Sequence, residues 1–143
     1  MMPTLTLVEA RVPALRAAII GPLTRFNEER TGQVEDYRPL AVLLTESGTG
    51  EIIGGLDGDT MFGHLHVDLL FVPAPLRQRG LGRQLMACAE NEARRRGCRG
   101  AWLDTYSFQA REFYERIGYT VFGVIEDFPP GHRRFFLKKA LSA

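Results

Sequence analysis

The sequence predicts a mixed α/β domain with a central, mainly antiparallel sheet that includes one parallel pair of strands and is flanked by helices. Two observations support this fold class. Residues 61–106 contain a long strand, a basic glycine-bearing turn, the most regular helix pattern of the chain and another strand. That order implies a right-handed crossover and parallel pairing of the two strands. Short strands joined by turn formers on either side indicate antiparallel neighbours.

Length and composition predict one domain over residues 1–143 and exclude several classes of protein. The chain has 143 residues, 45% of them hydrophobic, and a formal net charge of +1, so no strong charge drives it towards nucleic acid or an anionic membrane. It has two cysteines, no apolar run long enough to cross a bilayer and no secretory leader pattern at its start. We therefore expect a cytoplasmic protein, with Cys88 as a small core residue.

The first third of the chain predicts a short strand, two helical pieces and a hairpin. The strand covers Leu5–Val8, and Pro13 suits the first turn of a helix that is interrupted at Gly21-Pro22. A second helical piece runs over Leu23–Arg30. The apolar run Pro39–Thr45 is followed by a turn over residues 46–50 and a strand over residues 51–56.

The middle of the chain carries the clearest patterns. A turn is expected at residues 57–60, followed by a long strand over Met61–Val72 that prolines 73 and 75 end. The next helix has apolar residues at a spacing of four from Leu81 to Ala93, Glu90 away from that face, and a basic run with Gly97 at its end. We interpret the basic run as a helix cap.

The last third predicts two more strand–turn units around a short helix. A strand over Ala101–Tyr106 pairs in parallel with the strand before the long helix. Ser107 can cap the following helix, which carries Tyr114 and ends at Gly118. Two final strands cover residues 119–125 and 134–138.

The basic turn before the long helix predicts an anion site. Its two glycines, Gly80 and Gly82, let a backbone approach a ligand, and the unpaired N–H groups of the following helix point at the turn. A third glycine of the dinucleotide-binding pattern is absent, and so is the Gly-Lys-Ser/Thr of a Walker loop. The kind of site that is left is one that binds a pyrophosphate through backbone N–H groups from about Arg77 to Arg83.

Two motifs give the chain a resemblance to the GCN5-related N-acetyltransferase (GNAT) superfamily. Arg77-x-x-Gly80-x-Gly82 matches the hallmark Arg/Gln-x-x-Gly-x-Gly/Ala, and Phe113-Tyr114-x-x-x-Gly118-Tyr119 is similar to the family's aromatic helix end. The resemblance covers residues 40–141 well. It implies the acyl-CoA N-acyltransferase fold, with the parallel strands splayed apart, and acetyl-CoA as co-substrate for acetylation of a primary amine.

The resemblance also assigns roles to residues. Tyr114 is expected to protonate the leaving thiolate, and Ser107 stands where the family often has Asn, so it would contact the pantetheine arm or cap the helix. The strand residues Leu70, Phe71 and Val72 are expected to pair with the pantetheine arm, and a backbone N–H near Leu70 to bind the thioester oxygen. The residues expected to hold the pyrophosphate are Arg77, Gln78, Arg79, Gly80, Leu81, Gly82 and Arg83.

The strand before the turn offers groups that can take the proton of the amine. A period of two places His64, His66, Asp68 and Leu70 on one face. An imidazole titrates near neutral pH, so we favour His66 as base with Asp68 binding the substrate ammonium. The reverse assignment, and a reaction with no dedicated side-chain base, stay open.

Two other functions fit parts of the sequence. His64-x-His66-x-Asp68 is similar to the start of the zinc motif of metallo-β-lactamase-like hydrolases, but Leu69 stands where the next histidine belongs, so we expect no metal. A non-catalytic module that senses acyl-CoA would need the turn alone. The expected partners are acetyl-CoA and an amine that the sequence does not identify, and a homodimer is compatible with it.

Overall fold

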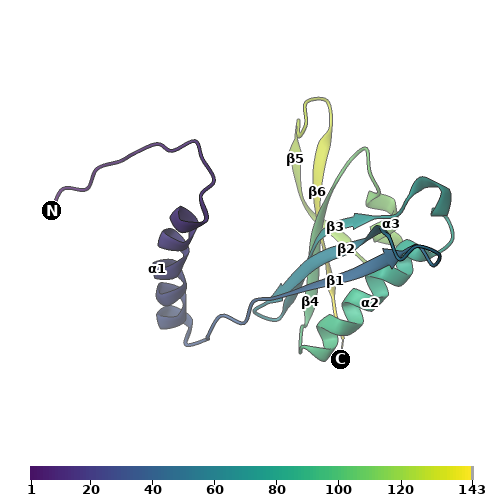
Figure 1. The fold of residues 1–143 in the computed structure, drawn as a ribbon, viewed down its shortest axis with the longest axis horizontal. Helices are drawn as coiled ribbons and strands as arrows, with labels where there is room; N and C mark the ends of the chain where they lie inside the picture. The colour runs from purple at the N-terminus through teal and green to yellow at the C-terminus, as the bar shows by residue number, and fades with distance from the viewer. Residues whose placement is uncertain (143) are drawn as a thin grey trace. The chain divides into compact units, whose positions relative to one another are not determined.

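The computed structural model describes residues 1–142, which form two compact units divided after Glu35. The first unit contains one helix, and the second contains the sheet with the remaining helices (Figure 1). None of the helices in the described part of the chain is long and apolar enough to cross a membrane.

The N-terminal unit differs from the prediction in two ways. Helix α1 (Pro13–Thr31) runs unbroken through Pro22, and Gly32 ends it in a left-handed conformation. A proline inside a helix removes one hydrogen bond, but its fixed φ is helical, so a long helix can continue past it. Residues 5–8 form no strand, because the unit contains no second strand with which they could pair. The predicted break at residues 21–22 and the predicted first strand were both wrong.

The second unit is built on a six-stranded sheet, which is mixed and mainly antiparallel as predicted. Its order is β1-β2-β3-β4-β6-β5, with β3 and β4 parallel and the other neighbours antiparallel. The strands are β1 (Arg38–Thr45), β2 (Ile52–Met61), β3 (His64–Phe71), β4 (Gly100–Tyr106), β5 (Thr120–Glu126) and β6 (Arg133–Ala140). Between them lie the 3₁₀ turn η1 (Ala74–Leu76) and helices α2 (Leu81–Arg95) and α3 (Arg111–Arg116).

The hairpin between β2 and β3 turns later than predicted. Residues 57–60, which contain a typical turn sequence, belong to β2, and the chain reverses at Phe62 and Gly63, both with positive φ. Two such residues in succession form the hairpin turn that matches the twist of the strands. The shift places Asp59 opposite His66.

Helix α2 covers one face of the sheet and forms the core with it. It packs against β1, β2 and β3 (Figure 1). Its buried apolar residues meet fully buried strand residues such as Leu65, Leu103 and Leu137, and each such side chain contributes roughly 2 kcal/mol by leaving water. The buried residues of α2 are Leu85, Met86, Ala89, Glu90 and Ala93.

Two predictions about α2 were wrong. Cys88 is exposed and Glu90 is buried. At about 100° per residue, Cys88 lies roughly 130° from the centre of the buried arc, whereas Glu90 lies at its edge. A spacing of four residues drifts around a helix, so the pattern misjudged both positions.

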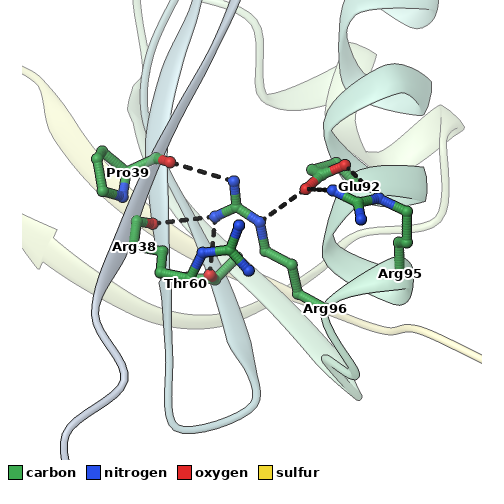
Figure 2. A network of polar contacts seen from close by, with 6 residues as sticks. All are labelled: Arg38, Pro39, Thr60, Glu92, Arg95 and Arg96. Atoms are coloured by element: carbon green, nitrogen blue, oxygen red, sulfur yellow. Dashed lines mark hydrogen bonds and ion pairs between the residues drawn. The ribbon is translucent and has the colours of Figure 1, made fainter.

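The basic run at the end of α2 does more than cap the helix. Arg96 donates hydrogen bonds to the carbonyl oxygens of Arg38 and Pro39, at 3.1 and 3.2 Å, and to Thr60 Oγ1 at 3.1 Å (Figure 2). Its Nε also bonds to Glu92 at 2.8 Å. Hydrogen bonds from Arg95 and Arg96 lower the pKa of Glu92 to about 2. The run thereby fastens α2 to strands β1 and β2.

Candidate active site

The parallel pair of strands separates half-way along and opens a cavity. Pairing of β3 with β4 runs from His64 opposite Gly100 to Val67 opposite Leu103, while β3 remains paired with β2 as far as Phe71. The edge of β3 that faces β4 therefore has no strand partner beyond Val67. A cavity of about 960 Å³ lies there, lined by the ends of β3 and β4, the turn after β3, the start of α2, and α3. The splayed pair is confirmed.

A β-bulge changes which residues of β3 share a face. Asp57 pairs with Leu69 and Gly58 with Val67, so Asp68 is the extra residue of the bulge. Beyond it the alternation shifts, and Leu70 joins Leu65 and Val67 on the side of the core. Leu70 therefore does not share a face with His66, as a strict period of two predicted. Asp68 lines the cavity.

The turn after β3 presents backbone donors to the cavity. The Arg77 N–H is taken by the Ala74 carbonyl oxygen at 3.2 Å, so Arg77 does not supply the backbone donor that was expected of it. Its Nε instead donates to the Val72 carbonyl oxygen at 2.8 Å, which ties the turn to β3. Gln78 and Gly80 adopt left-handed conformations and reverse the chain into α2.

The first turn of α2 points its unpaired N–H groups at this turn. Gln84 donates to the Gly80 carbonyl oxygen at 3.0 Å and closes the first turn of the helix. The N–H groups of the three preceding residues are the free donors of a helix N-terminus, where the helix dipole favours an anion. The turn residues that line the cavity are Arg77, Gln78, Gly80, Leu81, Gly82 and Arg83; Arg79 does not.

Tyr114 lies on α3 and lines the same cavity. Its side chain is buried, and burial, with a smaller effect of the Asp104 carboxylate, raises its pKa to about 12. Among the described residues, no side-chain nitrogen or oxygen is both fully buried and without a hydrogen-bond partner. The Tyr114 hydroxyl forms no hydrogen bond with another described residue, so it is not fully buried. The hydroxyl therefore opens into the cavity as a protonated donor.

His66 lies outside the residues that line the cavity. Its ring stacks on Trp102 with centroids 4.0 Å apart and planes 19° apart, and its Nδ1 lies 3.7 Å from Asp59 Oδ2. Both side chains of the His66–Asp59 pair are about one quarter exposed. His64, His66 and Asp68 do not converge, and no group of metal-binding side chains is found in residues 1–142.

Ser107 has a role different from the predicted cap. The N-cap of α3 is Ala110, and Ser107 Oγ accepts the Arg133 N–H at 3.0 Å, next to His132 Nδ1 at 3.4 Å. Ser107 lines a second, smaller hollow together with Gln109 and Ala110. It connects the end of β4 to the start of β6 instead of starting the helix.

Several residues that line the cavity were not predicted. Asp104 accepts a hydrogen bond from Arg134 Nε at 2.7 Å. Gln109 Oε1 accepts from the Tyr106 N–H at 2.9 Å and Thr105 Oγ1 at 3.1 Å, which holds the loop after β4. A signal for Asp104 existed in the sequence, because a carboxylate near the carboxyl end of a parallel strand faces the same edge as the turn after its neighbour.

The chain matches known acetyltransferases over most of its length. Residues 13–119 match the model of the acetyltransferase (GNAT) family. The chain is 42% identical to blasticidin-S acetyltransferase of Streptomyces morookaense over 139 residues, which cover 95% of this chain and 94% of that protein. It is 40% identical to acetyltransferase Atu2258 of Agrobacterium fabrum (strain C58 / ATCC 33970) over 122 residues, covering 85% and 88% of the two chains.

A solved structure has the same fold. The crystal structure of an Agrobacterium tumefaciens protein described as an acetyltransferase superposes with a TM-score of 0.89 at 36% identity, over 96% of this chain and 99% of that one. The family model, both relatives and the solved structure are all described as acetyltransferases. The chain is an acyltransferase that moves an acetyl group to an amine, and it belongs to the GNAT family.

Proposed function

We propose that this acetyltransferase acetylates a primary amine of a small cationic molecule, and that blasticidin S is the first acceptor to test. The observation that carries the proposal is that one cavity between β3 and β4 is lined by the donors of the turn, the unpaired edge of β3 and Tyr114. The 42% identity to a blasticidin-S acetyltransferase over nearly the whole chain supports the choice of acceptor.

Acetyl-CoA would lie along the cavity with its pyrophosphate on the turn. The free N–H groups at the start of α2, with the helix dipole behind them, would bind the phosphates. The unpaired edge of β3 from Asp68 to Phe71 would bond to the pantetheine amides as a neighbouring strand does. A backbone N–H near Leu70 would donate to the thioester oxygen and stabilise the negative charge that develops there.

Transfer would proceed by direct attack. The amine nitrogen forms a bond to the thioester carbon, the C–S bond breaks, and the sulfur leaves as a thiolate. The Tyr114 hydroxyl, which lies on the cavity wall and is protonated at neutral pH, would give its proton to that thiolate. The tyrosinate would then regain a proton from solvent through the cavity.

His66 is proposed to accept the proton that the amine loses. Asp59 beside Nδ1 and Trp102 against the ring fix the orientation of the imidazole, which leaves Nε2 free. Since His66 lies outside the cavity, the acceptor would approach over the sheet face that carries His66 and Trp102. Asp68, on the cavity wall, would bind the acceptor ammonium before it loses its proton.

The charges beside the cavity support a cationic acceptor. Asp59 and Asp68 lie on β2 and β3, close to the bulge, and Asp104 lies on β4. Arg134 pairs with Asp104 and His66 pairs with Asp59, so Asp68 is the carboxylate left for an ammonium group. The cytoplasm is the proposed location of the reaction.

An acceptor screen tests the proposal. The purified protein is mixed with acetyl-CoA and, one at a time, blasticidin S, polyamines, aminoglycosides, amino acids and peptide amines, and the release of free thiol is measured. We expect the highest rate with blasticidin S or another small polycation. A faster reaction with peptide amines would contradict the proposed acceptor class. Bound acetyl-CoA without turnover on any amine would favour the acyl-CoA sensor.

A further inference from the structure

A buried carboxylate in α2 lies at the centre of a polar cluster that the reaction described above does not use. The Glu90 side chain is only 6% exposed. Its Oε2 accepts a hydrogen bond from the Tyr119 hydroxyl at 2.8 Å, and its Oε1 accepts one from Lys139 Nζ at 2.8 Å. Arg94 lies at 3.9 Å from the same Oε1. A buried carboxylate without such partners is strongly destabilising, so the cluster is a stable unit only when it is complete.

The cluster joins three elements that are far apart in the sequence. Glu90 belongs to α2, Tyr119 directly precedes β5, and Lys139 belongs to β6. The Lys139 Nζ also lies over the Tyr119 ring, 5.5 Å from its centroid, and its Cε and Nζ lie close to Gly118. The lysine therefore fixes both the carboxylate and the tyrosine ring.

Tyr119 contacts the residue that is expected to protonate the thiolate. The rings of Tyr114 and Tyr119 meet edge to face, with centroids 6.1 Å apart and planes 75° apart. The Tyr119 N–H donates to the Tyr114 carbonyl oxygen at 3.0 Å. Tyr119 thus contacts both the ring and the backbone of Tyr114, and its own hydroxyl is hydrogen-bonded to Glu90.

We infer that Glu90, Tyr119 and Lys139 are positioning residues that hold the Tyr114 hydroxyl where the thiolate leaves. The inference rests on the proposed role of Tyr114. None of the three residues lines the cavity, so they act through Tyr114 and not on the substrates. A proton donor that is displaced by a fraction of an ångström loses much of its effect on the rate, while substrate binding is unchanged.

The cluster is suited to this task because α3 is short. Six residues make fewer than two turns, and such a helix has little stability of its own. The Tyr114 ring meets the rings of both Phe113 and Tyr119 edge to face, with centroids 5.1 and 6.1 Å away. Removal of the Tyr119 hydroxyl would release the Tyr119 ring from Glu90 without leaving a hole in the core.

A double-mutant cycle on the turnover rate tests the inference. With the best acceptor of the screen, Tyr119→Phe should lower kcat about tenfold and leave the KM for acetyl-CoA within about twofold. In a Tyr114→Phe background the same substitution should change kcat by less than about twofold, because the group it positions is already absent. An equal loss of kcat in both backgrounds overturns the inference, since it would reveal a general structural effect.

Further variants separate the possible failures. If Tyr119→Phe does not fold, Lys139→Met replaces it in the cycle with the same expectation. Glu90→Gln, which keeps a hydrogen-bonding partner for Tyr119, should retain more of kcat than Glu90→Leu, and equal losses would contradict the positioning role. If Tyr114→Phe alone keeps full turnover, the proposed role of Tyr114 fails and the inference with it. If Tyr114→Phe lowers turnover and the cycle is additive, only the inference fails.

The matched control is Glu115→Gln on the same helix. Glu115 forms an exposed pair with Arg111 and lies outside the cavity. The Glu115→Gln variant should have an unchanged kcat. A fall in kcat as large as that of Tyr119→Phe would overturn the inference, because any change near α3 would then have the same effect.

Discussion

Gly82 on α2 and Phe113 on α3 are in contact: a Cβ at Gly82 would lie 3.2 Å from Cζ and 3.4 Å from Cε1 of the Phe113 ring. The first turn of the helix that is proposed to bind the pyrophosphate therefore packs against the helix that carries Tyr114. The absence of a side chain at Gly82 lets these two parts of the site lie next to each other.

Substitutions at Gly82 should affect binding of acetyl-CoA according to size. The Phe113 ring tip can yield a few tenths of an ångström, so Gly82→Ala should raise the KM for acetyl-CoA by about twofold at most. Gly82→Val would push the ring and the helix start apart, and we expect a rise of about tenfold or more. Steady-state kinetics with varied acetyl-CoA measure both, and equal values for the two variants would contradict the packing argument.

Arg77 should matter through the turn that it holds. Its guanidinium bonds to the Val72 carbonyl oxygen and lies over the Phe71 ring, 5.7 Å from the centroid. Arg77→Met should raise the KM for acetyl-CoA about fivefold and leave kcat within about twofold, because the turn loosens while Tyr114 stays in place. The exposed Arg99→Met serves as control. A fall in kcat with an unchanged KM would contradict this role.

The two candidate bases on β3 can be separated by pH. If His66 accepts the amine proton, His66→Ala should remove the ascending limb of the profile of kcat against pH, and Asp59→Asn should lower kcat because the ring is no longer oriented. Asp68→Asn should retain the limb and raise the KM for the acceptor. Loss of the limb in Asp68→Asn alone would assign the base to Asp68. If both variants keep the ascending limb, neither side chain is the base and water accepts the proton.

The raised pKa of Tyr114 predicts a loss of stability in alkali. The folded protein holds the phenol proton more tightly than the unfolded chain, whose tyrosines have a pKa of about 10. The resulting stabilisation, on the order of 2 kcal/mol, is complete below pH 10 and is lost as the pH rises through about 12. Urea unfolding at several pH values should therefore give a shallower alkaline loss for Tyr114→Phe. The exposed Tyr37→Phe should not differ from the parent protein.

Arg96 should contribute more to stability than its neighbour Arg95. Its side chain is 11% exposed and bonds to two carbonyl oxygens and a threonine of β1 and β2, whereas the Arg95 side chain is 69% exposed. Arg96→Met should lower the free energy of unfolding by about 2 kcal/mol, since the half-buried guanidinium contacts are removed and the hydroxyl of the buried Thr60 loses a hydrogen-bond partner. Arg95→Met should leave it unchanged. Denaturant unfolding monitored by circular dichroism compares the two, and equal effects would contradict the fastening of α2 by Arg96.

The features that the sequence predicted well depend on local order. The helix after the turn, the parallel pairing of its flanking strands and the placement of Tyr114 on a short helix all follow from periodicity and from the handedness of a crossover. The opening between β3 and β4 was expected only from the resemblance to the family, whereas the turn itself was predicted because its glycines and the following helix are adjacent in the chain. Their geometry needs no distant partner.

The features that were missed depend on residues far away. The bulge at Asp68 arises in the pairing of β3 with β2, and no pattern in the sequence of β3 alone predicts it. Residues 57–60 resemble a turn but are held in β2 by the strands on both sides. Glu90 resembles a surface residue until Lys139, 49 positions later, meets it. Partners at such distances decide between local alternatives of similar energy.

The sheet has an unpaired edge in its interior, where β3 and β4 part beyond Val67 and Leu103. Open edges normally lie at the rim of a sheet, where a second chain can add to them and start aggregation. Here the open edge faces a cavity of about 960 Å³ that α2 and α3 help to line. A bound pantetheine arm would complete the sheet, and the amide hydrogens of residues 69–72 should then exchange with solvent more slowly than in the free protein.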